Sequence, residues 1–525
     1  MRLAKVAFEP VSPLVRERCP SPCECGPRSV MKRLRLLLIG VCGLCFLSAC
    51  GGGGGSSASP SPPPMATHLA VTAPVNAIAD SAFDFTVTAL DASNNTVTTY
   101  SGIVHFTSTD AQAVLPSNST LTNGTKSFSA TLRTTGSMTI SATDTVTASI
   151  TGVSSAIKVS AAMAAGTFTA TGSMMDAREE HAATLLIDGR VLVTGGSNST
   201  GTLATAEICD PASATFTLTG NMTTARSQHT ATLLSGGKVL VVGGADASGN
   251  ALAAAETFDP VSGTFTPIAN LGTTRLGHTA TLLNDGRVLI AGGENTTGNL
   301  ATAELFDPGT GLFTSAAGNM TASRVFHTAT LLSRGKVLIA GGTDSANVNG
   351  SALGDLFDPA TATFTPTAGG GTTAIHLAAA LLQDGRVLLT GGEDNGSSCG
   401  LCGNFVSSGL AILFSSSSAS FAAAGDMTTA RLNHTATLLS GGQVLIAGGA
   451  TISVTCNRGC PFKTFINPEA TAELFMPSQG IFTLTGNMTT TRSEHTATLL
   501  GNGKVLLVGG VDANGNALAT AELFQ

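Results

Sequence analysis

Short runs of alternating apolar and polar residues make up most of the chain beyond residue 66. Between residues 67 and 160 such runs stand at 83–90, 103–106, 128–132 and 138–142, with Asn-Asn and Asn-Gly turn sequences between them. Alternation over four to eight residues is typical of a β-strand with one buried face. The pattern predicts an antiparallel β-sandwich over residues 67–160, with no visible catalytic constellation and an expected role as a spacer or an adhesive module.

From residue 164 onward the strand pattern recurs as a repeat of about 50 residues. Each unit reads Arg-x-x-His-x-Ala-x-Leu-Leu, a tight loop with Gly, Arg/Lys-Val-Leu-x-x-Gly-Gly, a variable loop, Ala-Glu-x-Phe-Asp-Pro and Thr-Phe-Thr. The repeats are marked by the Gly-Gly pairs at 195-196, 243-244, 292-293, 341-342, 391-392, 448-449 and 509-510. Four short strands per unit at this period predict a propeller or a solenoid.

The two ends of the repeat region predict how the ring closes. The last repeat stops at Phe524-Gln525 without a fourth strand, whereas residues 166–171 form an unattached fourth strand before the first repeat. Pairing these fragments completes one blade and leaves no sheet edge unpaired at the closure. We therefore predict an all-β chain in which a seven-bladed β-propeller at 164–525 follows the sandwich.

The repeat resembles the kelch repeat, in which each unit forms one propeller blade, and the resemblance covers residues 166–525. It departs from the kelch pattern in its aromatic residues. Phe stands where the family usually has Tyr, at Phe258, Phe306 and Phe357, and where it usually has Trp, at Phe216, Phe265, Phe313, Phe364, Phe421 and Phe482. The segment 67–160 resembles, by pattern only, the immunoglobulin-like domains of bacterial surface proteins.

The N-terminal segment resembles a bacterial lipoprotein signal peptide at residues 31–50. A basic start at Met31 is followed by an apolar run and then by Leu47-Ser48-Ala49-Cys50. The resemblance implies that Cys50 is lipidated and becomes the mature N-terminus, that residues 1–30 are an upstream mis-start, and that 51–66 are a Gly/Ser/Pro linker. We expect an exported protein that is lipid-anchored in the bacterial envelope, at the outer membrane or cell surface. An uncleaved membrane helix is the alternative.

Charged and imidazole side chains recur with the repeat, which favours a scaffold role for them over a catalytic one. The histidines are His181, His229, His278, His327, His376, His434 and His495. The predicted buried ion pairs are Arg178 with Glu207, Arg226 with Glu256, Arg275 with Glu304, Arg324 with Asp355, Arg431 with Glu473, and Arg492 with Glu522. The fifth repeat has Ala374 at the arginine position and Ile412 at the carboxylate position. A buried ion pair predicts that both charges are lost together, because one buried charge without its partner is costly.

Two long loops in neighbouring repeats, at 393–411 and 450–472, break the symmetry of the repeat region. Both lie between the second and third strands of a blade, so we expect them side by side on one face. Our candidate binding residues there are Phe405, Arg458, Phe462, Lys463 and Phe465. The loops also contain Cys399, Cys402, Cys456 and Cys460, for which disulfides are favoured in an exported chain and a zinc or redox site is the alternative.

Composition and charge narrow the function. Beyond residue 50 the chain has 18 Lys+Arg against 30 Asp+Glu, a net charge of −12, which argues against nucleic-acid binding. With no Trp and a single Tyr, Tyr100, the chain lacks the two tyrosine ligands of the copper site in galactose oxidase, an enzyme with kelch-like repeats. No hydrolase motif is visible.

These observations lead to our expectation of a non-enzymatic, monomeric binding or adhesion module. It would recognise an unknown protein or glycan through its propeller loops, contact the membrane through the lipid anchor, and need no metal or cofactor. The alternatives are an extracellular enzyme on a galactose-oxidase-like propeller and a structural envelope protein.

Overall fold

The computed structural model describes residues 65–160, 166–342, 354–368, 372, 374–396, 404–455 and 463–525. In this part of the chain every regular element is a β-strand. The described residues include no helix long and apolar enough to cross a membrane. The all-β class is therefore confirmed.

The N-terminal strands form three small sheets around one hydrophobic core. The sheets are β1 (His68–Thr72), β3 (Ala82–Leu90) and β6 (Thr125–Thr131); β5 (Ser119–Thr120), β4 (Ile103–Ser108), β8 (Ile140–Asp144) and β9 (Thr151–Val153); and β2 (Asn76–Ile78), β10 (Ile157–Ser160) and β7 (Gly136–Met138). All pairs are antiparallel except β2 with β10. The predicted alternation puts every second side chain of β3 into the core.

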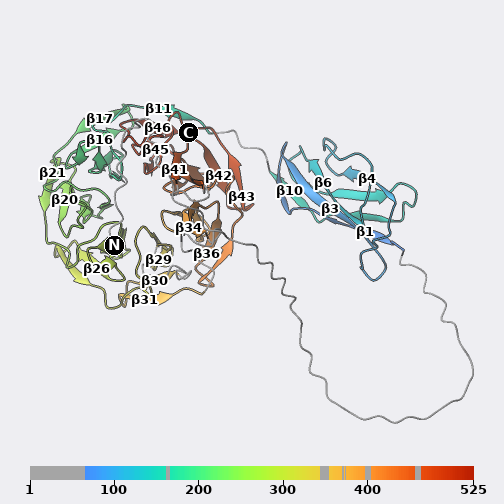
Figure 1. Ribbon diagram of the computed structural model, residues 1–525, viewed down its shortest axis with the longest axis horizontal. Helices are drawn as coiled ribbons and strands as arrows, with labels where there is room; N and C mark the ends of the chain where they lie inside the picture. The colour runs from blue at the N-terminus through green and yellow to red at the C-terminus, as the bar shows by residue number, and fades with distance from the viewer. Residues whose placement is uncertain are drawn as a thin grey trace, which may run out of the picture. The chain divides into compact units, whose positions relative to one another are not determined.

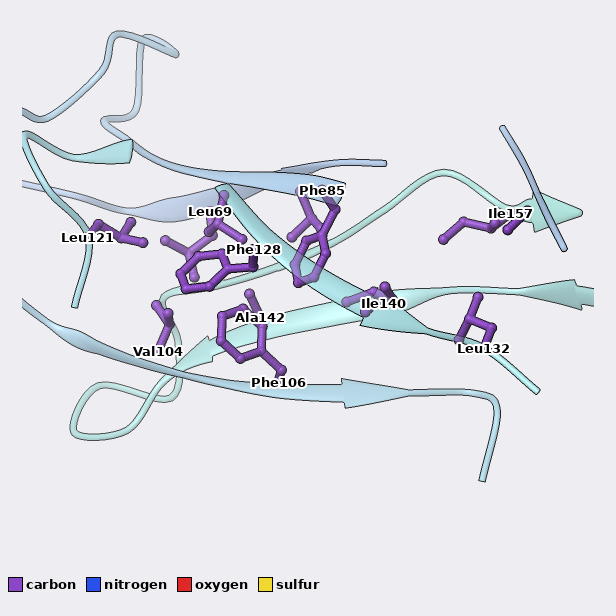
Figure 2. Close-up of a cluster of buried hydrophobic side chains, with 14 of the residues drawn as sticks. Leu69, Phe85, Val104, Phe106, Leu121, Phe128, Leu132, Ile140, Ala142 and Ile157 are labelled. Carbon is purple, nitrogen blue, oxygen red and sulfur yellow. The ribbon is translucent and has the colours of Figure 1, made fainter. Parts of the chain in front are cut away.

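Three phenylalanines form the centre of that core (Figure 2). The Phe85 ring lies edge-on to Phe106 at 5.6 Å between centroids, and Phe106 lies 4.7 Å from Phe128. Figure 2 shows Leu69, Val104 and Ile140 around them, so aliphatic side chains from both larger sheets cover the rings. This packing supplies the core of a domain that contains no cysteine. Its likeness to immunoglobulin-like domains stays a prediction.

The repeat region folds into seven four-stranded antiparallel blades arranged in a ring (Figure 1). The first six, each from the innermost strand outward, are β12 (Ala182–Leu185), β13 (Val191–Thr194), β16 (Ala206–Asp210), β17 (Thr215–Leu218); β18 (Thr230–Leu233), β19 (Val239–Val242), β20 (Ala255–Asp259), β21 (Thr264–Pro267); β22 (Thr279–Leu282), β23 (Val288–Ala291), β26 (Ala303–Asp307), β27 (Leu312–Ser315); β28 (Thr328–Leu331), β29 (Val337–Ala340), β30 (Asp355–Asp358), β31 (Thr363–Pro366); β32 (Ala378–Leu381), β33 (Val387–Thr390), β36 (Ala411–Ser415), β37 (Ser420–Ala423); and β38 (Thr435–Leu438), β39 (Val444–Ala447), β42 (Ala472–Met476), β43 (Ile481–Leu484).

The seventh blade joins the two ends of the repeat region. It consists of β44 (Thr496–Leu499), β45 (Val505–Val508), β46 (Ala521–Phe524) and, as the outer strand, β11 (Phe168–Ala170). Phe168 lies opposite Phe524 in the register, with 4.9 Å between the ring centroids. The innermost strands contact one another all around the ring, including β12 with β44. The predicted seven-bladed closure is confirmed.

Packing between blades explains why the second strand of each repeat is buried at every position and almost entirely apolar. All four residues of β13 are buried, because one face packs on the preceding blade and the other on the following one. The third and fourth strands contribute facing phenylalanines, such as Phe258 and Phe265 at 4.8 Å. These pairs fill the positions at which the kelch repeat usually has Tyr and Trp.

Some connections between second and third strands carry an extra hairpin. The short ones are β14 (Ser197–Asn198) with β15 (Gly201–Thr202), and β24 (Glu294–Asn295) with β25 (Gly298–Asn299). The long loops form β34 (Glu393–Gly396) with β35 (Asn404–Ser407), and β40 (Ala450–Thr455) with β41 (Lys463–Pro468). Strands β35 and β40 lie against each other, so the two long inserts are side by side, as their position in the repeat predicts.

Candidate active site in the central channel

The structure brings together the predicted charged pairs inside six blades. Arg226 Nη2 lies 2.8 Å from Glu256 Oε1, and both side chains are almost fully buried. The same guanidinium donates through Nη1 to the carbonyl oxygens of Gly243 and Ala254, each at 2.8 Å. The carboxylate therefore neutralises a cation that ties three backbone segments together. The other pairs are Arg178 with Glu207, Arg275 with Glu304, Arg324 with Asp355, Arg431 with Glu473 and Arg492 with Glu522.

The six histidines that stand in register bind a hydroxyl of the preceding blade. His181 Nε2 lies 3.0 Å from Thr496 Oγ1, a contact between the first and the seventh blade. Burial, together with the neighbouring Arg178 and Arg492, lowers the pKa of His181 to about 3. These imidazoles are therefore neutral links between blades. The equivalent contacts are His229 with Thr194, His278 with Thr230, His327 with Thr279, His434 with Thr390 and His495 with Thr435.

In each blade one residue directly precedes the repeated histidine position. These seven residues form a second ring, which we name the channel ring. It consists of Glu180, Gln228, Gly277, Phe326, His376, Asn433 and Glu494. All seven have a left-handed backbone, with φ between 51° and 60°. Six of them are not glycine, so the scaffold holds them in a conformation that costs about 1 kcal/mol or more each. Six backbone hydrogen bonds join neighbours in this ring, from Gln228 N to Glu180 O at 3.0 Å through Glu494 N to Asn433 O at 3.1 Å.

A cavity of about 370 Å³ lies within the channel ring, and all seven members line it together with the buried histidines. The ring differs from the rest of the repeat because its side chains vary from blade to blade. Residues around it repeat as a scaffold requires, whereas this position carries carboxylate, amide, aromatic and imidazole groups. This cavity-facing position, whose side chain varies between blades, is therefore our candidate functional site.

One side of the cavity carries a pair of carboxyl groups flanked by amides. Gln228 Nε2 donates to Glu180 Oε1 at 2.6 Å, and Asn433 Nδ2 donates to Glu494 Oε1 at 3.0 Å. Burial, with the nearby negative charges of Glu180 and Glu179, raises the pKa of Glu494 to about 8. At neutral pH Glu494 is protonated in most molecules. The site thus presents a carboxylic acid close to another carboxyl group.

The other side of the cavity is aromatic. The Phe326 and His376 rings lie 4.5 Å apart at an interplanar angle of 41°. His376 is here because the fifth repeat is shifted by one residue, which puts Leu377 at the scaffold position. Its Nδ1 lies 3.8 Å from Glu393 Oε2, at the base of the β34–β35 hairpin. Because of this shift, the histidine of the fifth repeat stands in the channel ring, one residue before the position of the other six histidines.

The loop residues predicted from sequence fall at the edge of what the structure describes. Phe405 lies on β35, and Lys463 and Phe465 lie on β41. Arg458 and Phe462 are outside the described residues, as are Cys50 and the cysteines Cys399, Cys402, Cys456 and Cys460. At the base of the inserts Ile452 N donates to Ser407 Oγ at 3.3 Å. The proposed binding patch and its disulfides stay predictions.

Sequence reasoning missed the channel ring, although a signal for it was present. Each member directly precedes the repeated histidine position, and the seven repeats have six different residue types there. Short catalytic motifs place their residues close together in sequence, and the channel ring has no such spacing. Glu180 and Glu494 come from the first and seventh blades, and only closure of the ring brings them together.

Comparison with solved structures identifies the fold. A fungal alcohol oxidase of the AA5 family, solved with copper, is similar over 69% of this chain and 76% of its own, with a TM-score of 0.53 and 17% sequence identity. The chain matches no protein-family model. No curated protein sequence is significantly similar to it. At this identity the likeness shows the fold alone, a β-propeller.

The comparison contradicts our expectation that the protein is not an enzyme. A solved structure that shares the fold is an alcohol oxidase, so a propeller of this kind can carry catalysis. The expectation rested on the single tyrosine of the chain and on the absence of short hydrolase motifs. A site assembled at a ring axis, from residues hundreds of positions apart, leaves no such motif.

The residues of this chain do not fit a copper centre with tyrosine ligands. Tyr100 lies outside the propeller, where its hydroxyl donates to Asp144 at 2.5 Å; burial and this contact raise its pKa. In the channel, the Nε2 atoms of the six in-register histidines lie against threonine hydroxyls of the neighbouring blades. Among the described residues, no three His, Cys, Asp or Glu side chains are arranged to hold a metal ion. These residues therefore do not form a copper site of that kind.

Proposed function

We propose that this protein is an exported enzyme that performs acid–base chemistry on a small polar substrate bound in the central channel of its propeller. Glu494 is assigned the role of general acid and Glu180 that of general base. The observation that carries the proposal is the channel ring, a position with varied chemistry inside a repeated scaffold and around one cavity.

The arrangement suits hydrolysis or elimination. A protonated carboxyl group can give a proton to a leaving oxygen, while a neighbouring carboxylate takes one from water or from carbon. Such a pair works when the two groups have different protonation states at one pH, and the carboxyl group of Glu494, with its raised pKa, meets that need. Gln228 and Asn433 fix the orientation of one carboxyl each through their amide donors.

A first test compares turnover by the purified protein and two variants. A panel of chromogenic glycosides and esters identifies a hydrolysed substrate, and Glu180→Gln is expected to lower kcat by about 10²- to 10⁴-fold, the usual contribution of a general base. Asp188→Asn is the matched control, because Asp188 lies in the hairpin at the other end of the first blade's inner strand. Full activity of Glu180→Gln with every substrate that the wild type turns over would contradict the assigned role.

We also propose that the enzyme is held at the envelope by a lipid on Cys50. The support is the signal-peptide-like sequence of residues 31–50. Replacing Cys50 by Ala is expected to release the protein from membranes, because two acyl chains or more are what gives stable anchoring. The check is the share of protein that stays with membranes after a carbonate wash. A Cys50→Ala protein that sediments like the wild type would overturn the anchor.

A further inference from the structure

We propose that the ligand of the channel cavity is a primary amine in its ammonium form, with a hydrocarbon part against Phe326 and His376. Its ammonium group would lie at the opposite side, formed by the carboxyl groups and amides of the channel ring, which we name the carboxyl–amide side. The inference rests on the proposed function and names its substrate class. Binding can be measured without turnover, so the two claims can be tested separately.

The cavity carries negative charge that no cationic side chain balances. Among the described residues that line it, two are glutamates and none is Lys or Arg. The six arginines of the repeat are already paired with carboxylates inside the blades. The six in-register histidines around the cavity are neutral, because burial lowers their pKa. A positively charged ligand is therefore attracted here and meets no opposing cation.

Further carboxyl groups stand next to the cavity. Glu179 is close enough to Glu494 for its charge to help raise the pKa of that group. Glu294 forms a β-bridge with the residue that precedes Gly277, and Glu393 lies beside the imidazole of the fifth blade. These carboxyl groups come from the first, third, fifth and seventh blades, so a cation that enters the channel is attracted from several sides.

The carboxyl–amide side offers oxygen atoms to an N–H donor. Gln228 and Asn433 each use one amide N–H on a carboxyl oxygen. Among the contacts of the described residues, this leaves each amide carbonyl oxygen and the second oxygen of Glu180 and of Glu494 without a partner. An ammonium group has three N–H donors and no acceptor, and its hydrogen bonds to carboxylates are charge-assisted. These four oxygens therefore suit an ammonium group.

The aromatic side stands across the ring from the two carboxyl groups and suits the hydrocarbon part. Phe326 and His376 belong to the fourth and fifth blades, with 4.5 Å between their ring centroids. A Cβ atom at Gly277 would come within 2.9 Å of Phe326 Cε1, so the phenyl ring leans over the one member of the channel ring without a side chain. The cavity volume of about 370 Å³ lies within the range of small-molecule sites, roughly 300–1,000 Å³.

Binding of the ammonium group should be coupled to the proton on Glu494. A positive charge nearby favours the ionised carboxylate, so the ligand competes with that proton. Burial and neighbouring negative charges raise the pKa of Glu494 to about 8. Affinity should therefore increase as the pH rises through about 8, because an alkylamine, like the lysine side chain, stays charged up to about pH 10.4. The proposed activity has the opposite pH dependence, since it needs the proton on Glu494.

The test is calorimetry on the full-length protein with n-hexylamine, 1-hexanol and hexanoate. These probes place a positive, a neutral and a negative group on the same hydrocarbon chain. Hexylamine should bind about tenfold more tightly than either of the others, because only its charged donors match the carboxyl–amide side. Its binding should also tighten between about pH 7 and about pH 9.

A variant locates the bound amine. Glu180→Gln keeps an oxygen for the Gln228 amide but removes the charge. It should weaken hexylamine binding about tenfold or more and leave any binding of 1-hexanol unchanged. Asp188→Asn is the matched control, because it removes a carboxylate from the hairpin at the other end of the first blade's inner strand. Thermal melting of each variant shows whether it is folded.

The outcomes separate this inference from the proposed function. If 1-hexanol or hexanoate binds as tightly as hexylamine, or if no probe binds, the ligand class is wrong. Equal affinity of wild type and Glu180→Gln for hexylamine would place the amine outside the channel and overturn the inference. If hexylamine binds as expected but Glu180→Gln keeps full turnover, the acid–base assignment fails while the amine site stands. If Glu180→Gln loses turnover and hexylamine does not bind, only the amine is wrong.

Discussion

Replacing Arg226 by Ala is expected to lower the free energy of unfolding by about 3–5 kcal/mol, because the change leaves the Glu256 carboxylate buried without its counter-charge. The carbonyl oxygens of Gly243 and Ala254 lose a donor at the same time. Burial lowers the pKa of Arg226, while Glu256 acts to raise it. The carboxylate of Glu256 therefore stabilises the charged form of Arg226 in the protein interior. Urea denaturation followed by circular dichroism measures the loss.

The fifth blade provides the matched control for this experiment. Ala374 and Ile412 occupy the same two positions there, and both are buried among apolar side chains. The double variant Arg226→Ala/Glu256→Ile copies that natural pair, and it should be more stable than either single variant, because no charge is left without its partner. A coupling energy of about 2 kcal/mol or more is expected. If the two single effects simply add, the pair is not a coupled buried unit.

Replacing Glu494 by Gln is expected to abolish most of the activity while making the protein more stable at alkaline pH. The loss should be about 10²- to 10⁴-fold in kcat, because the amide fills the same space but cannot deliver a proton. In the wild type, activity should fall as pH rises through about 8, where Glu494 loses the proton that it is assigned to donate. The pH dependence of kcat for both proteins is the measurement.

The stability effect has a definite sign. The folded state holds a proton on Glu494 up to a pKa of about 8, whereas an unfolded chain releases it near 4.5. Between these values the folded state binds more protons, so the free energy of unfolding falls as pH rises. Glu494→Gln removes this part of the fall, and its melting temperature should exceed that of the wild type above pH 8. Equal pH profiles for the two proteins would show that Glu494 is an ordinary exposed carboxyl group.

The sequence alone determined the scaffold, because a scaffold repeats. A period of about 50 residues, mostly apolar second strands such as Val191–Thr194 and an unattached strand before the first repeat were enough for seven blades and their closure. The ion pairs also followed from the repeat, since Ala374 and Ile412 changed together. In each case the signal was local or appeared in six or seven repeats, and the structure contains the same contacts.

Only the tertiary structure decided where the candidate chemistry lies. Glu180 and Glu494 are more than 300 residues apart, and each looks like a variable surface position beside a repeated histidine. The ring brings them to one cavity, where burial and mutual repulsion raise the pKa of Glu494. The same closure puts Phe326 and His376 on the facing side. Proximity and desolvation are properties of the folded ring, so no motif in the sequence records them.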